Sequence, residues 1–226
     1  MKLDRRSDDF IATLRARLYT AVLSDVLDEL GYRNQALPAH IRPLDESLNM
    51  AGFARTGIYR EVYRVVPHEN PYELEIALVD DLRRDDVAVL GCGGSTRIAP
   101  WGELLTTASR ARGAAGCLTD GYVRDVRQIR ALQFPVFHGG IAPLDSKGRG
   151  QIAEIDVPIH IAGVAVAPGD LVFGDADGVI VVPRAVEGAA LEKAFAKVDG
   201  EDRTREELAY VAHVAVGQAT GRAARP

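Results

Sequence analysis

Apolar residues recur at helical spacing in the first thirty positions of the chain. Ile11, Leu14 and Leu18 would share one face of a first helix, and residues 22–30 repeat the pattern in a second. Gly31 is expected to end the second helix, because glycine leaves helical geometry readily. The pattern therefore predicts two amphipathic helices at the start of the chain.

Between residues 51 and 119, short apolar runs alternate with helical patterns. Pro100 suits the first position of a helix, because its missing N–H would have no partner there. The predicted order is one or two strands over 51–66, a helix over 72–82, a buried strand over 87–90, a helix over 100–112 and a strand over 115–119.

The second half of the chain reads mainly as strands. Residues 122–132 predict a short helix or a structured turn, and from Phe134 onward Pro, Gly and Asp separate short, often antiparallel strands. Residues 185–216 predict a closing helical region that is interrupted near Gly200. Helices are therefore predicted at both ends of the chain, with strands dominating the second half before the closing helical region.

Composition sets the scale of the fold. The chain has 226 residues, of which 47% are hydrophobic and 26% are charged, which leaves room for one sizeable core. We expect one domain over residues 1–226, with a core of about 10–210 and a flexible tail at about 217–226.

Charge and cysteine usage narrow the possible partners. A net charge of −5 argues against binding to nucleic acid or to a membrane. The charged amino terminus carries no signal-peptide pattern, so the cytoplasm is the expected location. Cys92 and Cys117 match no metal or redox spacing, and both are expected to be buried.

The densest candidate chemistry lies between Trp101 and Asp125. The amides that start the predicted helix could hold a carboxylate, and Arg124 offers a planar pair of donors for another. Asp125 is a hard oxygen ligand of the kind that Mg²⁺ takes in ones or twos. Taken singly, Glu103 in a first helical turn or an Arg-Asp pair on the surface needs no function.

The spacing of these residues resembles a known signature. An acidic residue, twenty positions and then Arg-Asp is similar to the active-site pattern of the RraA-like / 4-hydroxy-4-methyl-2-oxoglutarate aldolase family. Further segments resemble the family in the same order, and together they cover about residues 10–210. These segments are LSDVLDELG (23–31), VFHGG (136–140) and PGDLVFGDADGVIVVPR (168–184).

The resemblance implies a fold, a reaction and an assembly. The implied fold is a layered α/β domain of the swivelling β/β/α type, with a mixed sheet flanked by helices. The implied activity is a divalent-metal-dependent lyase, with Mg²⁺ or Mn²⁺, that cleaves small 2-oxo acids through pyruvate enolate and also decarboxylates oxaloacetate. The implied partners are the oxo-acid substrate and further copies of the chain in a homotrimer or hexamer.

The resemblance also assigns roles to individual residues. Asp125 is expected to contact the metal and Arg124 to bind the substrate and stabilise the developing charge. Glu103 is expected to assist proton movement or to orient a water on the ion. Further substrate contacts are expected from the turn made by Gly102, Glu103, Leu104 and Leu105.

The sequence departs from the family pattern in two places and leaves a third open. Glu103 stands where the best-studied aldolases carry the shorter Asp. Gln128 stands where metal-binding members often carry an acidic residue. Some members complete the site with an acid from a neighbouring subunit's C-terminal helix, for which Glu201, Glu206 and Glu207 are candidates.

Two other functions compete with the lyase. A regulator of the RraA type, which binds and inhibits a ribonuclease through protein contacts, would have the same fold. The VAVLGCGGS segment, with Asp120 after the next strand, is similar to the glycine-rich turn of S-adenosylmethionine-dependent methyltransferases.

Overall fold

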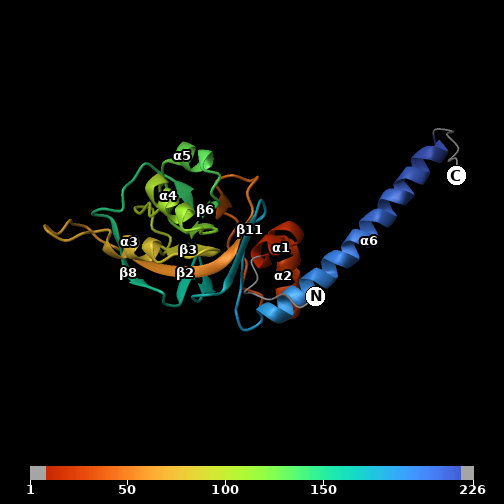
Figure 1. Cartoon of the computed structure of the whole chain (residues 1–226), viewed down its shortest axis with the longest axis horizontal. Coiled ribbons are helices and arrows are strands. Elements are labelled where there is room, and N and C mark those ends of the chain that lie inside the picture. Colours follow the sequence, from red (N-terminus) through yellow and green to blue (C-terminus); the bar gives the residue numbers. More distant parts are fainter. Residues whose placement is uncertain (1–8, 220–226) are drawn as a thin grey trace.

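The fold combines helices with one large mixed sheet (Figure 1). The computed structural model describes residues 9–219, and beyond Gly200 it describes the side chains of Glu201, Thr204 and Leu208. The helices are α1 (Phe10–Arg17), α2 (Thr20–Glu29), α3 (Glu73–Asp80), α4 (Glu103–Ala111), α5 (Val126–Ala131) and α6 (Glu187–Ala219).

The large sheet has the strand order β1-β6-β4-β3-β2-β11-β12, and β8 also pairs with β2. Its strands are β1 (Arg42–Pro43), β2 (Met50–Glu61), β3 (Asp86–Gly91), β4 (Gly116–Thr119), β6 (Val136–His138), β8 (Gly150–Ile155), β11 (Leu171–Asp175) and β12 (Gly178–Val182). Two small sheets pair β5 (Tyr122–Val123) with β7 (Gly140–Ile141) and β9 (Ile159–Ile161) with β10 (Val164–Val166).

Strands β2, β3, β4 and β6 run parallel, whereas the other strands of the large sheet pair antiparallel. The two ends of the sheet approach each other, because Arg42 on β1 donates to the carbonyl of Asp177 in the β11–β12 turn at 3.1 Å. The expected α/β class with a mixed sheet and flanking helices is therefore confirmed. The segments after β3, β4 and β6 leave from one edge, where ligands of open α/β sheets usually bind.

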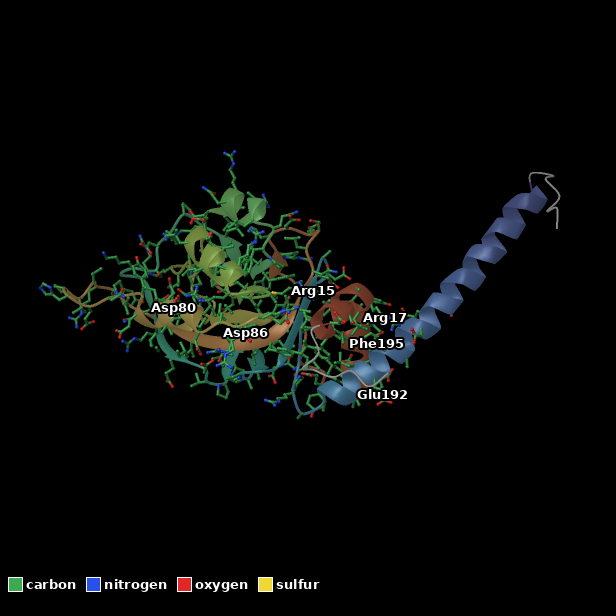
Figure 2. All side chains as sticks on the ribbon, viewed as in Figure 1. Arg15, Arg17, Asp80, Asp86, Glu192 and Phe195 are labelled. Carbon is green, nitrogen blue, oxygen red and sulfur yellow. The ribbon has the colours of Figure 1, made fainter. Side chains whose placement is uncertain are left out.

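A helical layer packs beside β11. Apolar side chains of α1, α2 and the start of α6 share one buried cluster with β11 and β12, and α6 then projects away from the body (Figure 1). Arg17 lies over the ring of Phe195 at 4.9 Å and so ties α1 to α6 (Figure 2). Among the described residues, no helix is both long and apolar enough to cross a membrane.

The structure corrects two details of the sequence-based expectation. α4 begins at Glu103 rather than at Pro100, because the backbone around Trp101 is extended and bridges to Val123. α6 continues through Gly200 without interruption. The short, often antiparallel strands expected in the second half of the chain are present as β8 to β12, while β6 pairs parallel with β4.

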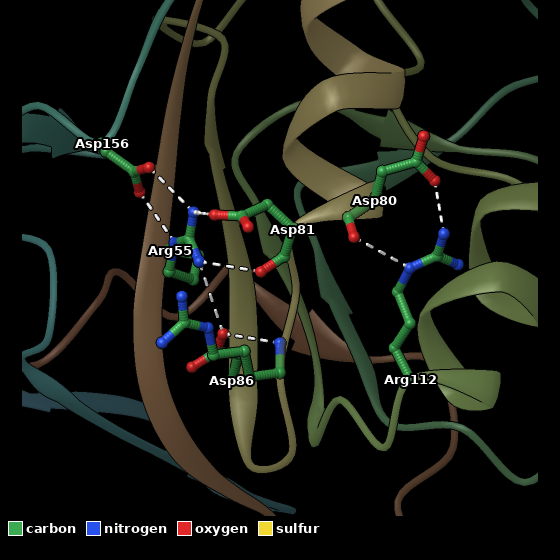
Figure 3. A network of polar contacts seen from close by, with 7 residues as sticks. Arg55, Asp80, Asp81, Asp86, Arg112 and Asp156 are labelled. Atoms are coloured by element: carbon green, nitrogen blue, oxygen red, sulfur yellow. Dashed lines mark hydrogen bonds and ion pairs between the residues drawn. The ribbon is translucent and has the colours of Figure 1, made fainter.

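An arginine on β2 gathers three carboxylates at one face of the sheet (Figure 3). Arg55 donates to both carboxylate oxygens of Asp156 at 2.8 Å and to Asp81 at 2.8 Å, and it lies 3.7 Å from Asp86. Its side chain is only 15% exposed, so little water screens these pairs. The cluster joins β2 to the end of α3 and to the segment before β9.

Replacing this arginine should destabilise the fold. Arg55→Met would leave carboxylates facing one another without their shared cation, and we expect a loss of about 2 kcal/mol in the free energy of unfolding. Urea denaturation followed by circular dichroism would measure it. Arg60→Met, at the exposed end of the same strand, should stay within about 0.5 kcal/mol of the wild type.

Candidate active site

A strand bridge brings the two halves of the predicted signature together. Trp101 pairs with Val123 in a parallel bridge, and the backbone N–H of Arg124 donates to the carbonyl of Trp101 at 3.0 Å. Trp101 is 1% exposed and stacks on Phe134, so this contact has a rigid base. Residues that are more than twenty positions apart therefore meet at the start of α4.

Asp125 occupies a constrained backbone position beside that helix start. Its φ of 59° and ψ of 35° lie in the left-handed region, which aspartate and asparagine tolerate better than most residues. Its Oδ2 atom accepts the backbone N–H of Glu103 at 3.1 Å. The amides at this helix start were expected to receive a substrate carboxylate. At least one of them, that of Glu103, instead donates to the protein's own carboxylate.

Gly102 makes room for this arrangement. A Cβ atom at this position would stand 2.7 Å from Asp125 Oδ2 and 3.2 Å from Arg124 Cγ. The absence of a side chain therefore lets the carboxylate and the guanidinium approach the backbone.

We expect Gly102→Ala to damage the site more than the fold. The added methyl group would displace the Asp125 carboxylate, and a shift of that kind lowers turnover by about 100-fold. Steady-state kinetics and a thermal melt would separate activity from stability. Gly188→Ala is the matched control because a Cβ atom there meets nothing within 4 Å; an unchanged rate in Gly102→Ala would contradict the assignment.

Arg124 is oriented by the segment that precedes β8. Its NH1 atom donates to the carbonyl of Leu144 at 3.2 Å and lies 3.7 Å from Asp145 Oδ1, while its Nε atom lies 3.8 Å from Asp125 Oδ2. Asp145 also accepts the hydroxyl of Tyr72 at 2.8 Å. The guanidinium is thus held between two carboxylates with its side chain 39% exposed, so it remains accessible to an anion.

The hydrogen bond between Tyr72 and Asp145 affects both groups. Partial burial and this bond raise the pKa of Tyr72 to about 12. Partial burial opposes ionisation of Asp145, but hydrogen bonds from Tyr72 and the backbone hold its pKa below the usual value. Asp145 therefore stays an anion that accepts, and Tyr72 stays a neutral donor, around neutral pH.

These residues line a pocket of about 360 Å³. Five of the six predicted site residues belong to its wall; the exception is Glu103, whose carboxylate accepts a hydrogen bond from Thr107 one turn along α4. The wall is formed by Tyr72, Glu75, Ile76, Ala99, Pro100, Trp101, Gly102, Leu104, Leu105, Arg124, Asp125, Asp145 and Ser146.

The residues that sequence reasoning missed come from two other segments. Tyr72, Glu75 and Ile76 belong to the start of α3, and Asp145 and Ser146 belong to the segment before β8. Glu75 looked like an ordinary polar position of a helix, and no spacing linked it to the signature. A single sequence carries no local pattern that marks these residues as part of the site, because their role depends on tertiary contacts.

The donor set suits a metal held by few protein ligands. The Asp125 side chain is 41% exposed, and one of its oxygens is already oriented by an amide. Within residues 9–219, no three His, Cys, Asp or Glu side chains that are described gather into a metal-binding cluster. A single, partly exposed carboxylate fits an ion of the Mg²⁺ type, which keeps several waters.

Three acidic residues were considered as contributions from a neighbouring subunit. Glu201 accepts a hydrogen bond from Tyr19 of its own chain. The side chains of Glu206 and Glu207 lie outside the described residues. Gln128 lies on the exposed side of α5.

The glycine-rich segment after β3 is tied down by Asp120. The carboxylate of Asp120, 7% exposed, accepts the backbone N–H groups of Cys92, Gly94 and Ala162. It is therefore engaged with the backbone instead of facing a nucleoside ribose, which argues against the methyltransferase. Cys92 is buried and unbridged, as is Cys117, in agreement with the prediction.

Comparison with known proteins identifies the family of the chain. The RraA-like family profile, described as Aldolase/RraA, matches residues 20–181. A protein of Halalkalibacterium halodurans named "putative 4-hydroxy-4-methyl-2-oxoglutarate aldolase" is 37% identical over 198 residues, which cover 88% of this chain and 87% of that protein. The chain belongs to the RraA-like family.

Two solved structures that superpose on this chain carry different described roles. RraAS2 of Streptomyces coelicolor, described as an unusual member of the RNase ES inhibitor RraA family, superposes with a TM-score of 0.77 at 28% identity and covers 89% of this chain and 98% of that one. A Geobacillus kaustophilus protein described as S-adenosylmethionine:2-dimethylmenaquinone methyltransferase has a TM-score of 0.56 at 27% identity, with 70% and 92% covered. Residue chemistry, rather than fold, must therefore decide the activity.

Proposed function

We propose that the protein is a divalent-metal-dependent carbon–carbon lyase for short 2-oxo acids that carry a second carboxylate. Within that class we propose 4-hydroxy-4-methyl-2-oxoglutarate aldolase activity together with oxaloacetate decarboxylation. The observation that carries the proposal is the convergence of Arg124, Asp125 and the start of α4 on one pocket. The aldolase name of a relative also supports a lyase activity.

The chain's own residues would bind and orient the substrate. Arg124 presents its guanidinium to a substrate carboxylate, and Leu144 and Asp145 hold the donors in place. Leu104 and Ile76, both exposed on the pocket wall, would cover the carbon chain and exclude water from it. Positive charge placed where the enolate develops lowers the barrier more than it strengthens ground-state binding.

Asp125 is the residue that would hold Mg²⁺ or Mn²⁺, through the carboxylate that the Glu103 amide orients. Such an ion, when bound, supplies Lewis-acid polarisation of the 2-oxo group. Thr107 donates to one carboxylate oxygen of Glu103, so Glu103 would contribute through its other oxygen or after turning towards the pocket.

Pyruvate release tests the proposal directly. We would incubate the protein with 4-hydroxy-4-methyl-2-oxoglutarate or oxaloacetate, with Mg²⁺ or Mn²⁺ and with excess chelator, and subtract the metal-only rate. The expected result is turnover above that background which chelator removes. Absence of turnover on both acids by folded protein would contradict the proposal.

The regulatory role is the second candidate, and the likeness to RraAS2 over 89% of the chain favours it. A pull-down and an activity assay with a ribonuclease of the E class would test it. We also propose that the protein is a cytoplasmic homotrimer or hexamer. Size-exclusion chromatography with light scattering would decide between these two assemblies and a monomer.

A further inference from the structure

Glu75 is a carboxyl group inside the proposed active-site pocket that the proposed function leaves without a role. It lies on α3, facing the pocket wall that contains Arg124 and Asp125. The hydroxyl of Tyr59, a buried residue of β2, donates to Glu75 Oε2, and the Ser146 hydroxyl bonds to the same carboxyl group. These two contacts fix the side chain from different elements of the fold.

The surroundings of Glu75 suit a group that changes its protonation state. Burial raises the pKa of Glu75 to about 6, against the lowering effect of the Tyr59 hydrogen bond. Asp145 adds to the increase and Arg124 opposes it. At neutral pH the group is therefore mainly a carboxylate that needs little free energy to take up a proton.

Three other titratable groups near Glu75 do not share this property. Burial is the main cause that raises the pKa of Tyr72, which precedes α3, to about 12 and that of the Cys92 thiol, after β3, far above its usual value. Asp145 is committed as an acceptor to Tyr72 and to the backbone of Lys147. From α4, the pocket receives the apolar side chains of Leu104 and Leu105.

We infer that Glu75 is the proton-transfer residue of this site, an inference that rests on the proposed lyase function. In aldol cleavage its carboxylate takes the proton of the C4 hydroxyl group as the C3–C4 bond breaks and the C4 carbonyl forms. The electron pair of that bond passes into the pyruvate enolate. The protonated Glu75 then returns the proton to C3, which completes pyruvate and regenerates the carboxylate.

The same step predicts a reaction that needs no C–C bond cleavage. The Glu75 carboxylate should remove a C3 proton from pyruvate and return a deuteron in D₂O, and proton NMR would follow the loss of the methyl signal. Glu75→Gln preserves the shape and can still accept from Tyr59. It should slow this exchange and aldol cleavage by about 100-fold or more.

Binding provides the readout that separates a chemical role from a structural one. Oxalate mimics the pyruvate enolate and needs no proton transfer, so its calorimetric affinity in the presence of Mg²⁺ should change by less than about threefold in Glu75→Gln. Glu73→Gln, an exposed position on the same helix, is the matched control and should exchange at the wild-type rate. A large loss of oxalate affinity in Glu75→Gln would overturn the inference in favour of a structural role.

The pH profile gives a second test with a defined sign. Aldol cleavage requires the carboxylate, so its kcat/KM should fall as pH decreases through about 6. Tyr59→Phe removes a hydrogen bond that lowers the pKa of Glu75, so the acidic limb of the pH profile, where kcat/KM falls, should move to higher pH. In Glu75→Gln the limb should disappear.

The outcomes distinguish this inference from the function on which it rests. In one outcome, the wild-type protein turns over the acids, and Glu75→Gln shows the same exchange rate, cleavage rate and pH dependence as the wild type. That result overturns the role of Glu75 and leaves the lyase proposal intact. A wild-type protein that neither cleaves these acids nor exchanges pyruvate protons overturns the lyase, and the inference with it.

Discussion

The Asp125→Asn protein is expected to release no pyruvate above the metal-only background, a decrease of about 1000-fold, which corresponds to about 4 kcal/mol. Asparagine tolerates the left-handed backbone of this position, and its side-chain oxygen can still accept the Glu103 amide. The substitution therefore removes the charge that would hold Mg²⁺ while it preserves the local geometry. Initial rates at saturating metal would measure the decrease.

A change at an exposed aspartate provides the control for Asp125→Asn. Asp28→Asn on α2 alters net charge equally and should leave turnover and melting temperature unchanged. Calorimetric titration with Mn²⁺ should also show weaker binding in Asp125→Asn alone. Retention of more than about a tenth of the wild-type rate would show that the metal is held elsewhere.

The Arg124→Ala protein is expected to lose about 1000-fold in kcat/KM, because one group both binds the substrate carboxylate and stabilises the enolate charge. Arg124→Lys keeps the charge but loses the planar pair of donors, so it should recover only part of the activity. The two variants together separate charge from hydrogen-bond geometry. Steady-state kinetics with both oxo acids would measure them.

Another arginine, on α5, supplies the matched control for Arg124. Arg127→Ala removes an exposed arginine three residues away and should change kcat/KM by less than about twofold. If Arg124→Ala raised KM without lowering kcat, Arg124 would contribute uniform binding rather than stabilisation of the transition state. Wild-type kinetics in Arg124→Ala would reject the site.

Much of the fold was predictable because its elements carry local signals. The spacing of Ile11, Leu14 and Leu18 predicted a helix, and α1 covers most of that segment. The short apolar run before the glycine-rich segment became β3, which is buried along its whole length. Periodicity along the chain determines such elements, since each reflects which side of one segment faces the core.

Local signals failed where a tertiary contact overrode them. Pro100 suggested a helix start, but the bridge between Trp101 and Val123 keeps the backbone extended until Gly102. Gly200 suggested a break, yet α6 continues, because one glycine lowers helix stability by only about 1 kcal/mol.

The order of residues along the chain was enough to predict the α/β class, the family and the spacing that links Gly102 to Arg124 and Asp125. Three-dimensional packing was needed to show that Asp125 accepts the Glu103 amide and that Asp145 orients Arg124. It also decided that Tyr59 and Glu75 meet beside the pocket. Those contacts join segments far apart in sequence, and they arise from the packing of α3, α4 and the sheet, which no periodic pattern encodes.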